Sequence, residues 1–173
     1  MASLDNDPHW FAARTPNCHE LKARDLLDHY GVEHFIPTHR ALVVRCDRKK
    51  LIEKSYLGNL IFLRATKELA CSLVNYNGLQ ARFIPDRCSG KTMLVVPDKE
   101  MDDFRRVFEY SDGENPLTDE TFVLGERIQI IAGDLVGVEG IVTEDSEGTF
   151  INVSLCGLLN ARAKIPAAFA QKI

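Results

Sequence analysis

A polar segment over residues 111–122 divides the sequence into two parts with different patterns. Residues 111–120 read Ser-Asp-Gly-Glu-Asn-Pro-Leu-Thr-Asp-Glu, with no apolar periodicity. Such a stretch is typical of a linker, because it holds Gly and Pro and nothing that would pack into a core. We therefore predict a first domain over residues 1–110, a linker over residues 111–122 and a second domain over residues 123–173.

The two parts also differ in charge. Residues 1–110 hold 17 Lys and Arg against 15 Asp and Glu, whereas residues 111–173 hold 4 against 10. Phosphate backbones are bound by Lys and Arg, so the acidic second part is a poor candidate for nucleic-acid binding by itself. The charge difference predicts two domains with different partners.

The composition predicts a cytoplasmic protein that does not bind membranes. Apolar residues make up 45% of the chain, which is enough for a packed core. The apolar runs are far shorter than the ~20 residues of a membrane span. The acidic, polar N-terminus lacks the basic and then apolar pattern of a signal peptide. The five cysteines form no close pair, which argues against a disulfide framework and a zinc site.

Short strands and amphipathic helices alternate in the first part. Strands are predicted over residues 9–14, 32–36, 56–64, 81–84 and 93–96. Helices are predicted over residues 17–30, 66–73 and 98–108. Asn17, Thr66 and Asp98 are the expected N-caps, and Gly31 is the expected stop of the first helix. Because most connections between strands are short, we expect an α+β domain with an antiparallel sheet flanked by helices.

One predicted strand, residues 56–64, is apolar on both faces. Leu60 and Phe62 fall on one face, whereas Ile61 and Leu63 fall on the other. A strand of this kind needs cover on both sides, so both faces are expected to pack against something.

Residues 41–44 and 51–52 flank the charged turn Asp47-Arg-Lys-Lys50, which predicts a hairpin with a basic tip. A solvated hairpin and a phosphate-binding surface are both compatible with this pattern. Few aromatic residues are interleaved, so stacking on single-stranded bases is not indicated. The candidate nucleic-acid contacts are Arg40, Arg45, Arg48, Lys49, Lys50 and Lys54.

The second part predicts a small all-β barrel. Ile128 and Ile130 alternate with polar residues, and residues 149–155 and 161–165 form further candidate strands. Glycines recur at positions 133, 137 and 140, and closely spaced glycines let strands bend and turn tightly. Several short strands within one short segment are typical of a barrel.

No group of residues predicts catalysis. Ser89–Thr92 read Ser-Gly-Lys-Thr, like the end of a nucleotide-binding loop. The first glycine of such a loop is replaced by Pro85, and a strand is predicted next where the loop needs a helix. The histidines and carboxylates have no metal-ligand spacing. We expect no enzyme, no metal site and no cofactor, although a nucleotide-binding enzyme remains the least favoured alternative.

The order of elements carries a family resemblance. A Trp10-Phe11 strand precedes a helix, the basic hairpin and the strand Ser55–Leu63. Val96–Phe104 then read Val-Pro-Asp-Lys-Glu-Met-Asp-Asp-Phe, and residues 125–142 carry the spaced glycines. The chain resembles the NusG/RfaH family of transcription elongation factors over nearly its whole length. The first part resembles the family's NGN domain, and residues 125–165 resemble its SH3-like KOW domain.

The resemblance implies partners and contact residues. It implies that the NGN-like domain docks on the clamp helices of the largest RNA polymerase subunit, and that the hairpin contacts non-template DNA. The implied polymerase contacts are Leu60, Phe62, Phe83, Met101 and Phe104. The KOW-like domain is implied to bind a small-subunit ribosomal protein or the termination factor Rho. Its implied contacts are Leu135, Val138, Leu155, Cys156 and Leu158.

Two departures from the family pattern suggest a specialised antitermination factor, similar to RfaH-like or UpxY-like members. Gly58-Asn59-Leu60 stands where the family usually has Pro-Gly-Tyr, and residues 66–72 lack the His-Thr-Thr that some specialised members carry. The resemblance thus implies a factor that suppresses pausing or termination. An RNA- or ribosome-binding KOW protein is the alternative, because KOW domains also occur in ribosomal proteins.

Overall fold

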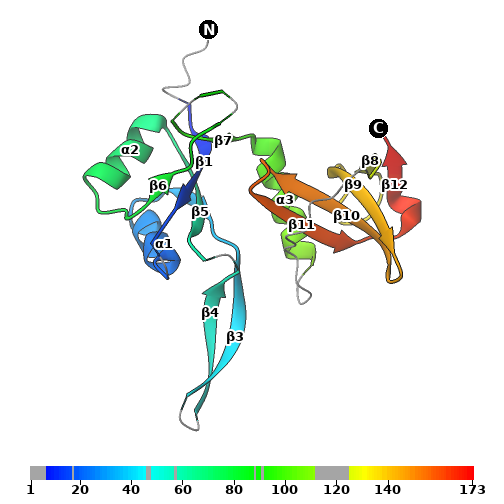
Figure 1. The fold of residues 1–173 in the computed structure, drawn as a ribbon, viewed down its shortest axis with the longest axis horizontal. Helices are drawn as coiled ribbons and strands as arrows, with labels where there is room; N and C mark the ends of the chain where they lie inside the picture. Colours follow the sequence, from blue (N-terminus) through cyan, green and yellow to red (C-terminus); the bar gives the residue numbers. More distant parts are fainter. Residues whose placement is uncertain are drawn as a thin grey trace. The chain divides into compact units, whose positions relative to one another are not determined.

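The computed structural model of the chain describes residues 7–16, 18–45, 48–56, 58–87, 89–90, 92–111 and 125–173. The chain forms two compact units, Met1–Val96 and Pro97–Ile173 (Figure 1).

The N-terminal unit contains an antiparallel sheet with two helices. Its strands are β1 (His9–Arg14), β2 (Glu33–Phe35), β5 (Leu60–Ala65), β6 (Arg82–Phe83) and β7 (Val95–Val96). The strand order is β2-β5-β1-β6, and β7 also pairs with β1. The helices are α1 (Glu20–His29) and α2 (Lys67–Asn75). This is the antiparallel sheet with helices that the sequence predicts for this part.

Local signals explain where the helices begin and end. Thr66 caps α2, because its hydroxyl accepts a 3.2 Å hydrogen bond from the N–H of Leu69. Gly31 follows α1 with a φ of +64°, a left-handed conformation that glycine adopts without steric cost. His19 is the N-cap of α1 and makes no capping bond with its side chain. The predicted cap, Asn17, lies outside the described residues.

Both helices cover the same face of the sheet. Phe11 of β1 and Ile61 and Leu63 of β5 form one buried cluster with Leu27 of α1 and Leu73 of α2. Residues at alternate positions of a strand face opposite sides of the sheet, so Leu60 and Phe62 lie on the other face. The alternation predicted for this strand is therefore confirmed.

Strand β5 begins later than predicted. Asn59 precedes it with a φ of +72°, which interrupts the extended backbone. The N–H of Asn59 donates to the buried carboxylate of Glu20, and its carbonyl accepts a 2.9 Å hydrogen bond from the N–H of Thr15. These bonds hold residues 58–59 as a turn, although the apolar pattern alone predicts a strand from residue 56.

The predicted hairpin is present as a separate two-stranded sheet of β3 (Thr38–Arg45) and β4 (Arg48–Ser55). Arg45 and Arg48 are directly opposite each other, so the paired strands extend farther toward the tip than predicted. Arg48, Lys49 and Lys50 therefore belong to strand β4 and not to the turn.

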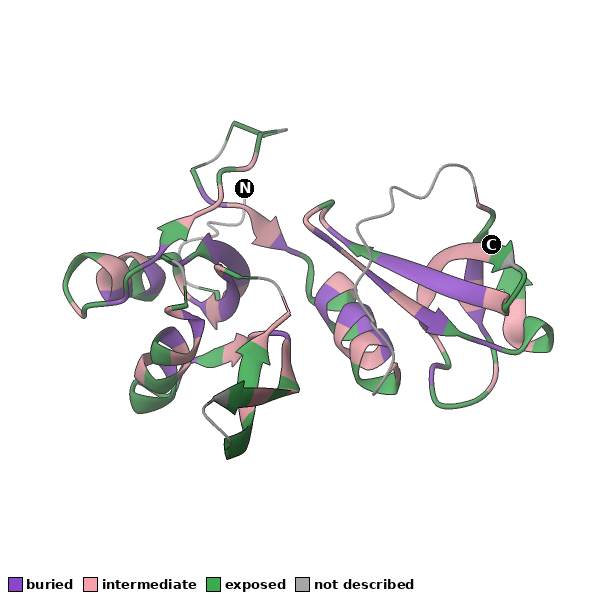
Figure 2. Ribbon diagram, turned by 60° about the horizontal axis from the view of Figure 1, so that its bottom comes forward, coloured by how far each residue is buried: buried purple, intermediate pink, exposed green. Residues whose placement is uncertain are grey.

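The C-terminal unit combines one helix with a second antiparallel sheet. It contains α3 (Asp98–Tyr110), β8 (Arg127–Ile130), β9 (Glu139–Asp145), β10 (Gly148–Leu155), β11 (Leu159–Lys164), the 3-10 helix η1 (Ala167–Phe169) and β12 (Ala170–Lys172). The strand order is β11-β10-β9-β8-β12. Buried residues run along strand β10 (Figure 2).

Apart from η1, the regular elements of residues 125–173 are strands of one sheet, as the all-β prediction requires. This sheet is open. Strands β11 and β12 are its two edges, and in the described part of the chain they do not pair to close a barrel. Strand β9 lies very close to β10 at Gly140, where an added Cβ would be 2.6 Å from the carbonyl oxygen of Asn152. Glycine is therefore required at this position.

Helix α3 belongs to the C-terminal unit, where it packs on β10 and β11. The hydroxyl of Ser111 donates a 2.8 Å hydrogen bond to the carbonyl of Arg162, and Asp103 accepts one of 3.3 Å from the N–H of Glu139. Fully buried Val107 lies between Asp103 and Ser111 on the same helix face. The observed boundary between the units, at residues 96 and 97, therefore differs from the predicted boundary at residue 110.

The position of Val107 leads to a prediction that distinguishes the two units. Val107→Ala removes buried methyl groups between α3 and the second sheet, so it should destabilise the C-terminal unit by about 2 kcal/mol. Hydrogen exchange should accelerate at the amides of β10 and β11, whereas the amides of β1 and β5 serve as an internal control. Faster exchange in β1 and β5 alone would contradict the assignment of α3 to the C-terminal unit.

Candidate functional site

The hairpin β3–β4 has two faces of different chemistry. In its register, Leu42 is directly opposite Leu51, and Val43 is opposite Lys50. Directly opposed residues of antiparallel strands lie on the same face, and neighbouring positions alternate. We call the surface of Arg48, Lys50 and Lys54 the cationic face, and the surface of Leu42, Val44 and Leu51 the apolar face.

The cationic face gathers most of the predicted nucleic-acid contacts. Arg48, Lys50 and Lys54 project from one face of β4 and are exposed to solvent. Arg40 and Lys49 are also exposed, but they lie on the side of the apolar face. The backbone of Arg45 pairs with Arg48, and its side chain is outside the described part of the chain. The structure thus places three of the six predicted cations in one row.

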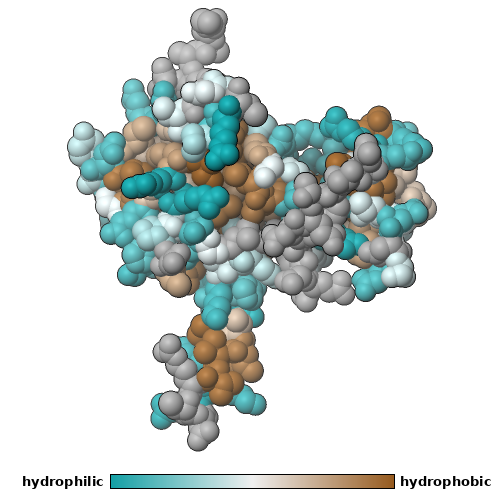
Figure 3. Space-filling model, viewed as in Figure 1, coloured by the Kyte–Doolittle hydropathy of each residue, from teal (hydrophilic) through white to brown (hydrophobic). Residues whose placement is uncertain are grey.

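The apolar face is open to solvent. Leu42, Val44 and Leu51 are 59%, 62% and 57% exposed. Figure 3 shows apolar side chains gathered on the hairpin. The predicted site did not include these residues, because only the cross-strand register places Leu51 beside Leu42 and Val44 on one face.

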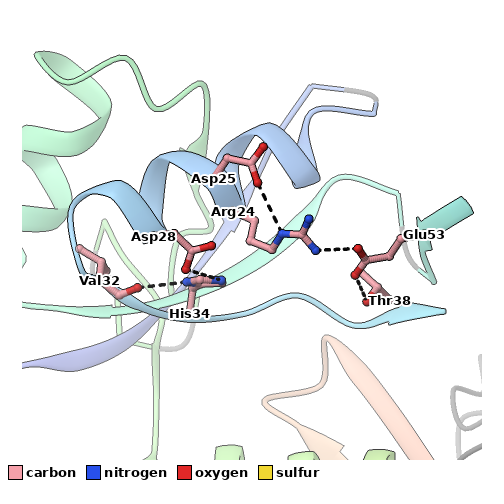
Figure 4. A network of polar contacts seen from close by, with 7 residues as sticks. All are labelled: Arg24, Asp25, Asp28, Val32, His34, Thr38 and Glu53. Carbon is pink, nitrogen blue, oxygen red and sulfur yellow. Dashed lines mark hydrogen bonds and ion pairs between the residues drawn. The ribbon is translucent and has the colours of Figure 1, made fainter. Parts of the chain in front are cut away.

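A polar network joins the base of the hairpin to α1 (Figure 4). The Arg24 guanidinium donates to one oxygen of Glu53 at 2.8 Å, and the Thr38 hydroxyl donates to the other at 2.8 Å. The hydrogen bond from Arg24, then that from Thr38, lowers the pKa of the Glu53 carboxyl. The same bond raises the pKa of Arg24. The bond from Arg24 joins the base of the hairpin to α1, and the bond from Thr38 joins the two hairpin strands.

A second short network lies beside this one. The ring of His34 is 3.0 Å from the carbonyl of Val32 through Nδ1, and its Nε2 is 3.9 Å from the carboxylate of Asp28. These contacts hold β2 against the C-terminal end of α1, next to the hairpin base (Figure 4).

Leu60 and Phe62 are adjacent on β5, as predicted, but they are not exposed. Leu60 is 7% exposed and Phe62 is 0% exposed. Because β5 lies between β1 and β2, Phe62 has a neighbour on each side, with Ala12 and Phe35 directly opposite it. The rings of Phe35 and Phe62 are 6.3 Å apart. The two side chains are therefore not an uncovered apolar patch in this structure, and their role as polymerase contacts stays a prediction.

Of the other implied polymerase contacts, Phe83 lies on a different sheet face from Leu60 and Phe62, and Met101 and Phe104 belong to the second compact unit. Phe83 of β6 packs on the face that α1 and α2 cover, with its ring 6.0 Å from that of Phe11. Met101 and Phe104 are fully buried and belong to α3 of the C-terminal unit. The apolar spacing of a strand or helix shows which residues need cover, but it does not show which element covers them.

Of the implied contacts in the second part, three are core residues. Leu135, Val138 and Leu155 are buried, whereas Cys156 and Leu158 lie half-buried in the turn after β10. Helix α3 contacts this turn, because the N–H of Cys156 donates to the carboxylate of Glu100 at 3.2 Å.

Helix α3 also contacts the loop between β8 and β9. The guanidinium of Arg106 donates to the carbonyls of Asp134 and Val136 at 2.8 and 2.9 Å. The adjacent apolar side chains of Ile131 and Val136 are 51% and 47% exposed. Ile131 and Val136 were not among the predicted contact residues. In the sequence, only their position beside the loop glycines points to them.

An ion pair links α3 to β9. Lys99 Nζ is 2.6 Å from Glu139 and 3.5 Å from Asp103. The hydrogen bond from Lys99 lowers the pKa of Glu139, and the same bond raises the pKa of Lys99. This contact adds a charge-dependent part to the packing of α3.

Ser89, the first residue of the Ser-Gly-Lys-Thr string, lies in a polar turn. The N–H of Ser89 donates to the Asp86 carboxylate at 3.2 Å, which makes an ordinary polar turn before β7. In the described ranges, no group of three or more His, Cys, Asp or Glu is placed to hold a metal ion. None of the helices searched there is long and apolar enough to cross a membrane.

Comparisons with known proteins give one family. The sequence model of the family described as "Transcription termination factor nusG" matches residues 8–105. These residues include β1, β5 and the whole hairpin. No curated protein sequence matches the chain. A solved structure called "Domain interaction in Thermotoga maritima NusG" is similar over 96% of this chain and 98% of that chain, with 20% identity and a TM-score of 0.49.

The network at the hairpin base predicts a pH dependence. Because the pKa of Glu53 is lowered in the folded state, the contribution of its carboxylate to stability is complete above the ordinary value of 4.5. It is lost as the pH falls through the lower value of the folded protein. The pair is partly exposed, so its contribution should be within about 1 kcal/mol. Arg24→Ala should raise the titration midpoint of Glu53, measured by NMR of the side-chain carboxyl carbon. An unchanged midpoint would show that Arg24 does not hold this carboxylate in solution.

Proposed function

The chain belongs to the NusG family, and from this membership we propose that it is a transcription elongation factor that binds RNA polymerase and suppresses pausing or termination. The observation that carries the proposal is the family match to the unit that presents the hairpin. Proteins of this family are transcription factors and not enzymes.

The proposed role of the cationic face is to contact the non-template DNA strand. Arg48, Lys50 and Lys54 stand in a row along one exposed strand face, which suits contact with a phosphate backbone. Such contacts position a protein on DNA without reading its sequence, because affinity comes from release of counterions. The network between Arg24, Thr38 and Glu53 supports this role, since it joins the base of the hairpin to α1.

The proposed contact with the clamp helices of the polymerase uses the sheet face that α1 and α2 leave uncovered. Leu60 and Phe62 lie at the middle of that face, beside Ala12 and Phe35. Both side chains are buried in the structure, so binding through them requires that they first become exposed. Phe83 is not part of this proposed contact, because it packs on the opposite face.

The proposed role of the C-terminal unit, as a KOW-like domain, is to recruit a second protein, either a small-subunit ribosomal protein or Rho. Its acidic charge favours a protein partner over nucleic acid. Ile131 and Val136 are exposed apolar side chains of this unit, and Leu158, one of the implied contacts, is half-buried. The departures at Gly58-Asn59-Leu60 and residues 66–72 support a specialised antitermination role, similar to RfaH-like or UpxY-like members.

The role of the cationic face predicts a specific loss of DNA affinity. A variant with Arg48→Ala, Lys50→Ala and Lys54→Ala should bind duplex DNA more weakly, because three phosphate contacts are lost. The slope of log K against log salt should become shallower by up to about 3. Binding can be measured by fluorescence anisotropy across a salt series, and antitermination by run-off transcription with purified polymerase.

A matched control carries Lys22→Ala, Arg82→Ala and Arg87→Ala, which removes three exposed cations of the same unit outside the hairpin. This control should keep the slope and the transcription activity of the original chain. Equal losses in both variants would mean that overall charge, and not the hairpin, determines DNA binding. If the original chain has no effect on elongation or termination, the proposed function is wrong.

A further inference from the structure

We propose that the apolar face of the hairpin is a docking surface for an acidic, apolar segment of a protein, distinct from the cationic face that contacts DNA. The inference rests on the proposed function, because it assigns a second contact between the hairpin and the transcription complex. It concerns Leu42, Val44 and Leu51, to which the family match gives no role.

The exposure of these side chains is the first observation. Leu42 and Leu51 face each other across the two strands, and Val44 follows Leu42 on the same face. All three are more than half exposed, whereas Ile52 and Val43 on the opposite face are half-buried. Neighbouring aliphatic side chains left in water on one strand pair mark an interaction surface.

The stability of the hairpin gives a second reason. Strands β3 and β4 pair only with each other in the described part of the chain. A two-stranded hairpin is marginally stable in water unless one of its faces is packed. The cross-strand aliphatic pair would gain most from a covering surface, because burial removes its apolar area from water.

The charges around the apolar face indicate the chemistry of the partner that it binds. Lys49 is directly opposite Val44 on the same face, and Arg40 lies next to Leu42 along it. Glu53, the carboxylate on this face, already accepts hydrogen bonds from Arg24 and Thr38. The face therefore offers aliphatic surface with cations beside it, which suits a partner that combines apolar side chains with carboxylates.

The same charges argue against a second copy of the chain. A symmetric pairing of two apolar faces would place two copies of Lys49 and two copies of Arg40 in one interface. Like charges at such an interface are unfavourable. Nucleic acid is also a poor occupant, because aliphatic side chains offer no stacking platform for bases and the row of cations projects from the other face.

The test compares two cross-strand pairs of the hairpin. The variant Leu42→Ser with Leu51→Ser changes the apolar face, and the control Ala41→Ser with Ile52→Ser changes the adjacent pair on the cationic side. Binding of each chain to purified core RNA polymerase and to a duplex DNA is measured by fluorescence anisotropy. We expect the first variant to bind polymerase at least about tenfold more weakly and DNA unchanged, a difference of about 1.4 kcal/mol, with the control close to the original chain.

Lys49→Glu is a second variant that leaves the apolar residues intact and tests the charge. It should also weaken polymerase binding. Because it keeps the apolar residues of the hairpin, it still tests the docking surface if the serine variant loses the hairpin. If the original chain binds polymerase and all variants bind it equally well, the docking surface is wrong while the proposed function stands. If the original chain does not bind polymerase, both are wrong.

Two other outcomes identify a different occupant and overturn the inference. Weaker DNA binding by Leu42→Ser with Leu51→Ser would assign the apolar face to nucleic acid. A dimer of the original chain in sedimentation equilibrium that becomes monomeric in the same variant would assign it to a second copy.

Discussion

The hydrogen bond from Arg24 to the carboxylate of Glu53 joins the hairpin to the rest of its unit. This carboxylate accepts hydrogen bonds from Arg24 of α1 and from Thr38 at the start of the hairpin, each of 2.8 Å. Without these bonds, the hairpin would be held to its unit by its two chain connections and by backbone bonds at its base, such as the 2.9 Å bond from Tyr56 to Pro37. The cationic face and the apolar face can bind different partners at the same time only if the hairpin keeps one orientation relative to its unit.

The two faces follow from the simplest rule of strand geometry. Neighbouring residues of a strand face opposite sides, so Lys50 and Leu51 cannot point in the same direction. The cross-strand register then decides which residues of β3 accompany them. A hairpin of this length can therefore carry two chemistries without any further element, and its position outside the main sheet leaves both faces accessible.

Local pattern predicted much of this fold. Residues 9–14 became β1, Thr66 capped α2, and the alternation of Leu60 to Leu63 correctly assigned the two sheet faces. The sequence could not show that Phe62 is buried, because burial depends on neighbours that are distant in the chain. Strand β12 was also missed, since three residues after a 3-10 helix carry too short a pattern.

Helix α3 shows the same limit on a larger scale. Its apolar residues predicted a helix, but nothing in their spacing specified which sheet it packs on. The contacts that decide this are polar and distant in sequence, such as those from Ser111 to Arg162 and from Glu100 to Cys156. The candidate site was likewise predicted only in part. The cluster of Lys and Arg could be recognised in the sequence, whereas the apolar face could be recognised only from the cross-strand register.

Site-specific photo-crosslinking in a transcription elongation complex would show whether the two faces of the hairpin contact different macromolecules. A benzophenone amino acid is placed at position 50 in one chain and at position 51 in another. We expect adducts with DNA from position 50 and with a protein subunit from position 51. Adducts with the same partner from both positions, or none from either, would contradict this expectation.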